Sequence, residues 1–244
     1  MIYKARKGQT VYGQSIGILM LDTQFTPYIP GDISNACTFD FPVTYEVVEG
    51  LTVERATSKD TTALNSLVKA GEKLVRGGVK AVSSNCGYLG FFQQELASRL
   101  AVPVFMSSLL QLPFISAMIG QGRKVGVLCV REATFDQSLL EGLGVDPALP
   151  MVVRGMDQWE HFYRGIMIDS GELDAARIEA EMVAASRKMV EEDSSIGAIL
   201  LECADMPPYS CAVQRAVGLP IFDFVTMINY VFSAVVQKRF EGFM

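Results

Sequence analysis

Short apolar, β-branched runs alternate along the chain with longer segments whose apolar residues recur at helical spacing. The apolar runs predict strands at residues 15–22, 43–50, 79–86, 102–107, 124–130, 149–156, 197–203 and 219–224. The longer segments predict helices at residues 60–76, 90–100, 108–119, 133–142, 173–192, 209–218 and 225–240. Because most of these strands are apolar throughout, they are typical of parallel sheets that helices cover on both faces.

The second half of the chain repeats the first at an offset of 117 residues, without a gap. Cys86 aligns with Cys203, and each cysteine is followed 17 residues later by a proline, Pro103 or Pro220. A fixed offset indicates two units of similar structure. We therefore expect an α/β fold with two similar doubly wound, Rossmann-like domains, each built on a parallel sheet and related by a pseudo-two-fold axis.

The predicted domains are an N-terminal α/β domain at 1–120 and a second α/β domain at 121–224, with the C-terminal helix at 225–244 packing back on the first. Cys86 and Cys203 each end a predicted strand, and open α/β sheets bind ligands outside the carboxyl ends of their strands. We expect the active site in the cleft between the domains, with both cysteines facing it.

Two thiols on opposite sides of a cleft suit proton transfer at carbon. One thiolate removes a proton from one face of a carbon atom, and the other thiol returns a proton to the opposite face, which inverts the carbon. This reaction needs no metal and no organic cofactor, so none is expected. The chain has five cysteines. Cys37, Cys129 and Cys211 lie in a predicted loop, mid-strand and on a predicted helix, and we interpret them as structural.

The sequences around these two cysteines resemble a known family. SNCGY at 84–88 and LECADMPPY at 201–209 resemble the paired cysteine motifs of the aspartate/glutamate/hydantoin racemase superfamily, and the resemblance extends over nearly the whole chain. The threonine that commonly follows each family cysteine is replaced here by Gly87 and Ala204. The histidine that glutamate racemases place beyond the second cysteine is also missing, which argues against glutamate as the substrate.

The resemblance implies a PLP-independent, cofactor-independent racemase or epimerase that inverts a carbon next to a carboxylate or carbonyl, in an amino acid or a hydantoin-like molecule. It implies that Cys86 and Cys203 are the acid/base residues, and that the enzyme is a dimer or larger homo-oligomer. The implied substrate-binding residues are Asp22, Thr23, Asn85, Gly87, Tyr88, Thr134, Glu202, Ala204 and Asp205.

Two alternatives remain open from the sequence. A maleate-isomerase-like enzyme would use one cysteine as a nucleophile on a double bond, and a small-molecule sensor would bind without turnover. Several aromatic residues could form a wall that favours a substrate larger than aspartate, or could serve only in packing: Phe25, Tyr28, Phe39, Tyr88 and Tyr209.

The composition of the chain argues against several classes of binding partner. The formal charge of −6 argues against nucleic acid, which needs a basic surface. No apolar stretch is long enough to predict a membrane span, and the N-terminus lacks the apolar core of a signal peptide. With an odd number of cysteines, we expect a cytoplasmic protein with reduced thiols. The single histidine, His161, is interpreted as a surface or packing residue in a loop, and no metal site is predicted.

Overall fold

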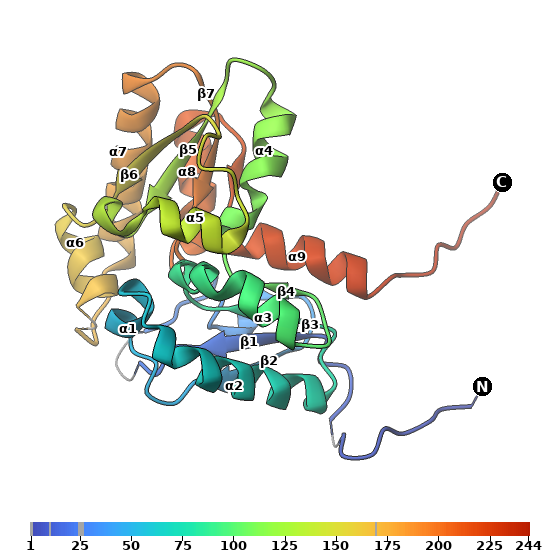
Figure 1. Cartoon of the computed structure of the whole chain (residues 1–244). Helices are drawn as coiled ribbons and strands as arrows, with labels where there is room; N and C mark the ends of the chain where they lie inside the picture. Colours follow the sequence, from blue (N-terminus) through green and yellow to red (C-terminus); the bar gives the residue numbers. More distant parts are fainter. Residues whose placement is uncertain (1, 10, 24–26, 169) are drawn as a thin grey trace.

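The chain folds into two α/β halves, seen one above the other in Figure 1. The structure is a computed structural model that describes residues 2–9, 11–23, 27–168 and 170–244. In the first half four parallel strands form a sheet of order β2-β1-β3-β4. The strands are β1 (Ile16–Met20), β2 (Val43–Val47), β3 (Ala81–Ser84) and β4 (Val104–Phe105). The helices of this half are α1 (Val53–Thr57), α2 (Leu64–Gly77), α3 (Gln93–Arg99) and α4 (Leu112–Ile119).

The second half has the same sheet order, β6-β5-β7-β8, again with all strands parallel. Its strands are β5 (Lys124–Cys129), β6 (Met151–Gly155), β7 (Ile196–Leu201) and β8 (Ile221–Phe222). Its helices are α5 (Gln137–Leu143), α6 (Glu160–Phe162), α7 (Ala175–Glu192), α8 (Ser210–Val217) and α9 (Phe224–Val235). The predicted fold class, two similar parallel-sheet α/β halves, is confirmed.

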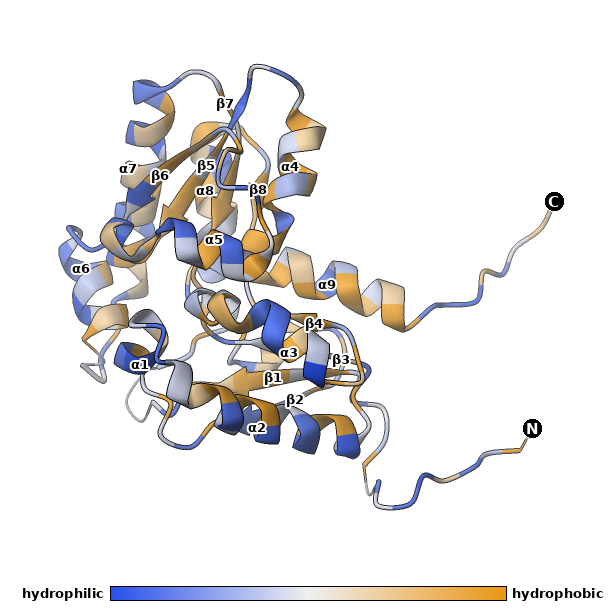
Figure 2. Ribbon diagram, viewed as in Figure 1, coloured by the Kyte–Doolittle hydropathy of each residue, from blue (hydrophilic) through white to orange (hydrophobic). Residues whose placement is uncertain are grey.

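The internal repeat is visible in the strands that carry the cysteines. β4 and β8 lie at the offset of 117 residues, and so do β3 and the last four residues of β7. Cys86 and Cys203 therefore follow equivalent strands, each next to the first strand of its own sheet. Figure 2 shows the hydrophobic residues concentrated in the strands and on the helix faces turned toward them.

In each half, the helix that follows the last strand packs against the sheet of the other half. α4, which follows the last strand of the first half, packs against β5 and β7 of the second sheet. α9, which follows the last strand of the second half, packs on the first sheet, where Phe224 and Ile228 share a core cluster with Ile16 and Ile18. The exchange buries apolar residues of both halves in common cores. The domain boundaries at 120 and 224 stay predictions.

Two short helical elements were not predicted. α1 buries only Ala56, so it has no apolar face that a periodic pattern could reveal. His161 lies in α6, which continues into a π-helical segment at Tyr163–Met167, and the predicted loop at this residue is wrong. The last helix ends at Val235 instead of residue 240, because no residue beyond it is buried and nothing holds it to the core. Among the described residues, no helix is long and apolar enough to cross a bilayer.

The exchanged helix α9 provides a test of the shared core. Phe224→Ala should lower the free energy of unfolding by about 3–5 kcal/mol, because it empties a fully buried site against the first sheet. Tyr230→Ala on the same helix is the matched control. Tyr230 is 74% exposed, so its loss should change stability by no more than about 0.5 kcal/mol. Denaturant unfolding of the two variants measures both values, and equal effects would contradict the packing described here.

Candidate active site

A cleft of about 770 Å³ lies where the carboxyl ends of the strands of both sheets meet. Segments that follow β1, β3, β5 and β7 line it, together with α1 and the π-helical segment. The lining residues are Leu21, Asp22, Thr23, Thr52, Val53, Glu54, Thr57, Asn85, Cys86, Gly87, Tyr88, Val130, Arg131, Thr134, Ile166, Met167, Glu202, Cys203 and Asp205. All the predicted site residues except Ala204 are therefore brought to one cleft.

Cys86 and Cys203 enter the cleft from different sheets. Cys86 is 9% exposed and Cys203 is 7% exposed, so both side chains are largely buried from solvent. Burial raises the pKa of Cys86 to about 12, and the neighbouring Glu202 adds to this, while the amides of Tyr88 and Leu89 oppose it. Burial also raises the pKa of Cys203, with Asp205 and Glu202 as further causes. Both groups therefore favour the thiol form at neutral pH.

The surroundings of the two thiols differ. Cys203 Sγ donates a hydrogen bond to Asp205 Oδ2 over 3.2 Å. Asp205 in turn shares a hydrogen bond with Asp32, whose side chain is buried. Burial, and then the charge of Asp205, raise the pKa of Asp32 well above its usual value, so Asp32 favours its protonated form. Cys86 receives hydrogen bonds from the backbone amides of Tyr88 and Leu89, whereas Cys203 receives one from the amide of Asp205.

Asp32 was missed in the sequence because its local signal is that of a turn. Asp32 Oδ1 accepts from the amide of Ser34 at 2.6 Å, which is an ordinary Asx-type turn contact. A turn signal does not reveal that the loop of Asp32 packs on the other half. A Cβ on the neighbouring Gly31 would lie 2.8 Å from Pro208, so the two loops are in direct contact.

Glu202 lies on the floor of the cleft with no exposed surface. Its Oε2 accepts from the amide of Val130 at 3.4 Å, and its Oε1 has no hydrogen-bond partner in the described part of the chain. Burial raises the pKa of Glu202 to about 8, and the charge of Asp205 contributes further. The carboxyl group packs against the backbone of Gly87, which follows Cys86 in the other half.

The polar residues at the end of β1 mainly hold the loops in place. Asn85 Oδ1 accepts from the amide of Leu21 at 2.8 Å, so its side chain fixes the end of β1. Asp22 accepts from the amide of Gly50 at 2.9 Å. Thr23 Oγ1 lies 2.7 Å from the hydroxyl of Tyr28. These contacts position the rim of the cleft, and substrate contacts by Asp22, Thr23 and Asn85 stay a prediction.

Tyr88 and Thr134 link the halves across the cleft. The buried hydroxyl of Tyr88 donates to the carbonyl of Arg131 at 3.1 Å and accepts from Thr134 at 2.6 Å. The guanidinium of Arg131, which lines the cleft, has no ion-pair or hydrogen-bond partner among the described residues. Sequence reasoning missed Arg131 because nothing distinguishes an arginine after a strand from a solvated one until the cleft is formed.

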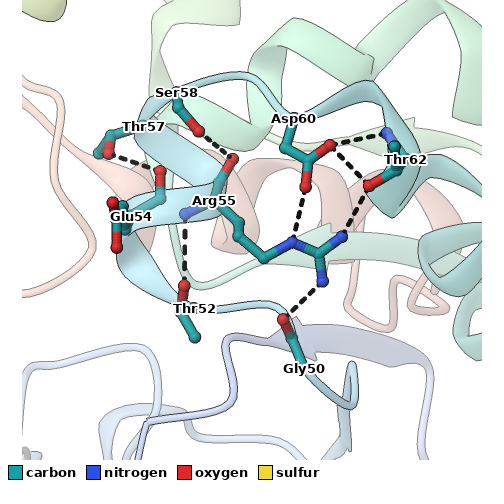
Figure 3. Close-up of polar contacts among 8 residues, drawn as sticks. All are labelled: Gly50, Thr52, Glu54, Arg55, Thr57, Ser58, Asp60 and Thr62. Carbon is teal, nitrogen blue, oxygen red and sulfur yellow. Dashed lines mark hydrogen bonds and ion pairs between the residues drawn. The ribbon is translucent and has the colours of Figure 1, made fainter.

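α1 forms one wall of the cleft through Thr52, Val53, Glu54 and Thr57. Figure 3 shows how Arg55, on the same helix, fixes this wall. Its guanidinium donates to the carbonyl of Gly50 at 2.7 Å, to Asp60 Oδ2 at 2.7 Å and to Thr62 Oγ1 at 3.0 Å. These three hydrogen bonds of Arg55 thus hold a helix that has little apolar area of its own to bury.

Some predicted residues lie away from the cleft surface. The side chain of Ala204 is buried in the core cluster that contains Ile16 and Phe224. Phe39 belongs to the same cluster and packs beside Phe41, and Tyr209 is buried with its hydroxyl unpaired among the described residues. Of the predicted aromatic wall, Tyr88 alone is a lining residue in the described part of the chain, while Phe25 lies outside the described residues.

Comparison with solved structures defines the class to which this fold and cleft belong. Unliganded arylmalonate decarboxylase matches with a TM-score of 0.58 and 15% identity over 93% of this chain and 94% of that one. Allantoin racemase from Pseudomonas fluorescens matches with a TM-score of 0.58 and 16% identity over 91% of each chain. A glutamate racemase from Bacillus anthracis matches with a TM-score of 0.57 and 16% identity over 92% and 82%. The chain has the two-domain racemase fold, as the resemblance implied.

Sequence relatives define the family more closely. A dimethylsulfoniopropionate lyase from Durusdinium sp. clade D is 30% identical over 240 residues, which are 95% of this chain and 78% of that protein. Dimethylsulfoniopropionate lyases 7 and 3 from Emiliania huxleyi (strain CCMP1516) are 30% and 29% identical over 92% of this chain, and the matches cover 68% and 60% of those proteins. No family model matches the chain. The chain belongs to the dimethylsulfoniopropionate lyase family.

These relatives correct the predicted reaction. The expectation of an enzyme is confirmed, but the expectation of an amino-acid or hydantoin racemase is wrong, because the relatives are named lyases. The physical reason is that racemisation and elimination begin alike, with a base removing a proton next to a carboxylate. Two cysteines at strand ends predict a base for this proton removal. They do not predict whether the resulting carbanion is reprotonated or expels a group, because that depends on whether the substrate carries a leaving group. In the described part of the chain, no cluster of His, Cys, Asp and Glu is arranged to hold a metal ion.

The contact between Glu202 and Gly87 predicts that residue 87 must be glycine. A Cβ there would lie 1.9 Å from Glu202 Oε1 and 2.6 Å from the carbonyl oxygen of Glu202. Gly87→Ala should therefore destabilise the protein by about 1–3 kcal/mol through overpacking. Gly77→Ala is the control, because a Cβ there meets nothing within 4 Å and alanine favours the helix. Thermal unfolding of both variants is the measurement, and a neutral Gly87→Ala would contradict the contact.

Proposed function

We propose that this enzyme is a lyase that cleaves dimethylsulfoniopropionate, or a closely similar β-sulfonium carboxylate, by β-elimination without a cofactor. Family membership supports the substrate class. The observation that carries the mechanism is that two thiols from opposite sheets line one cleft, together with several carboxyl groups and an arginine whose guanidinium has no partner among the described residues. The elimination would yield dimethyl sulfide and acrylate.

The first step is the removal of a proton from the carbon next to the substrate carboxylate. We assign this step to Cys86, because two backbone amides, those of Tyr88 and Leu89, favour its thiolate, whereas Cys203 has one such amide. The thiol of Cys203 donates a hydrogen bond to Asp205, and this bond stabilises its protonated form. When the Cys86 thiolate takes the proton, the electron pair of the broken C–H bond moves onto the carboxylate of the substrate, which becomes an enediolate.

The second step breaks the bond between carbon and sulfur. The electron pair returns from the enediolate to form the carbon–carbon double bond, and the electrons of the C–S bond leave with sulfur. Because the sulfonium is cationic, dimethyl sulfide departs neutral and needs no proton from an acid. The net charge is unchanged, since a thiolate and a zwitterion become a thiol, a neutral sulfide and acrylate. Cys86 then returns its proton to water.

The charges of the cleft complement a zwitterion. The free guanidinium of Arg131 would bind the substrate carboxylate, for which arginine offers paired donors. Asp205 lies on the wall of Cys203, opposite the proposed base, where its negative charge would stabilise the sulfonium. Asp22 and Glu54 add further negative charge at the rim. Cys203 would thus face the departing sulfide, a soft sulfur contact that a hydroxyl reproduces poorly.

The assignment of the two thiols can be tested by substitution. Cys86→Ser should slow the release of dimethyl sulfide from dimethylsulfoniopropionate by about 10²–10⁴-fold, because an alcohol is a far weaker acid than a thiol. Cys203→Ser should also release it more slowly but should still exchange the proton next to the carboxylate with heavy water, whereas Cys86→Ser should not. Gas chromatography and NMR are the two measurements. Cys211→Ser, at an exposed thiol outside the cleft, is the control. If Cys86→Ser alone kept the exchange, the base would be Cys203.

The role of Arg131 predicts a change in binding. Arg131→Met should raise KM for dimethylsulfoniopropionate about tenfold or more, which corresponds to about 1.4 kcal/mol of lost binding, and should lower kcat less. Arg154→Met is the matched control, because Arg154 pairs with Glu192 away from the cleft. Steady-state kinetics of both variants are the measurement. An unchanged KM in Arg131→Met would mean that the carboxylate binds elsewhere.

A further inference from the structure

Glu202 is the buried carboxyl group that the two thiols share. It directly precedes Cys203 in the chain, and its side chain packs against Gly87, which directly follows Cys86. Both thiols feel its charge, since Glu202 is a cause of the raised pKa of each. The carboxyl group therefore lies on the floor of the cleft, between the backbone segments that carry the two thiols.

The hydrogen bonds of Glu202 are incomplete. A carboxyl group with no exposed surface normally has partners for both oxygens, yet Oε2 accepts one long bond from Val130 and Oε1 has no partner among the described residues. No lysine, arginine or histidine of the described chain forms an ion pair with Glu202. An unpartnered oxygen of this kind is costly to bury, and Glu202 is a lining residue of the cleft where the substrate would lie.

We infer that Glu202 is a catalytic hydrogen-bond donor, which acts as a neutral carboxylic acid and donates from its free oxygen to the substrate carboxylate. This inference rests on the proposed function. When the Cα proton leaves, negative charge builds up on the two oxygens of the substrate carboxylate, so a donor aimed at them is stronger in the transition state than in the ground state. An ionised Glu202 would instead repel both the substrate carboxylate and the enediolate.

The protonation state required for this role is the one that the surroundings favour. Burial raises the pKa of Glu202 to about 8, so most of the enzyme holds the acid form at neutral pH. The active enzyme would need the Cys86 thiolate and the Glu202 acid together. Because the pKa of Cys86 is raised to about 12, the thiolate fraction grows with pH over the whole working range.

These two requirements predict a distinctive pH profile. In wild type, dimethyl sulfide release should rise about tenfold per pH unit while the thiolate fraction grows, and should level off above pH 8, since the gain in thiolate is cancelled by loss of the Glu202 proton. Glu202→Gln keeps a donor that does not titrate. It should remain active below pH 8 and should continue to rise above pH 8, where wild type is level.

The controls separate a donor from other roles. Glu202→Leu removes the donor and should lose most activity while folding at least as stably, because an unpaired buried carboxyl is replaced by an apolar side chain. Glu192→Gln, at the surface pair with Arg154, should reproduce the wild-type profile. If Glu202→Gln is inactive at every pH, Glu202 is a base and the inference fails. If wild type and Glu202→Gln keep profiles of the same shape, Glu202 plays no titrating role and the inference fails.

A stability measurement tests the protonation of Glu202 without any turnover. A carboxyl whose folded pKa is raised from 4.5 to about 8 contributes stability below pH 4.5 that is lost as the pH rises through 8. The unfolding free energy of wild type, relative to Glu202→Gln, should therefore fall between pH 4.5 and 8. A constant difference would overturn the neutral-acid assignment. If this difference falls as expected but wild type releases no dimethyl sulfide, the proposed function fails and the protonation of Glu202 still holds.

Discussion

The exchange of α4 and α9 between the halves is the constraint on which the rest of the structure depends. Each helix follows the last strand of one sheet and packs on the other sheet, so apolar burial fixes the two sheets relative to each other. With the two sheets fixed in this way, the carboxyl ends of β3 and β7 lie at the same cleft. Without that arrangement, the two cysteine loops would be unrelated surface segments with ordinary thiols.

The same packing explains why two carboxyl groups with raised pKa values, Glu202 in the cleft and Asp32 beside it, lie so close to the thiols. Burial of both halves against each other leaves Asp32 and Glu202 with almost no exposed surface. Removing a carboxylate from water is costly, so burial raises the pKa of each group and favours its protonated form. Burial raises the pKa of both thiols as well, so the acid forms of neighbouring groups are favoured around the cleft.

The relation between racemases and this lyase family follows from the shared first step. In the proposed mechanism both need a base next to a carboxylate-bearing carbon, and the cysteine proposed as that base follows a strand end. What separates them is how the carbanion is resolved. In the proposed elimination, the cationic leaving group departs without a proton, so the wall opposite the base is free to carry negative charge. Asp205, where the racemase-type motif departs from its commoner form, lies on that wall.

The sequence by itself determined the strands, most helices, the repeat and the two cysteines at equivalent strand ends, because these depend on local periodicity and on comparison within one chain. Only the tertiary structure decided which helix covers which sheet, and it alone brought Arg131 and α1 to the cleft and placed Asp32 beside the lining residue Asp205. Their importance comes from contacts between segments far apart in the chain, such as Gly31 with Pro208 and Gly87 with Glu202. A turn aspartate or a solvated arginine carries no periodic signal, so its role appears only when long-range packing removes the water around it.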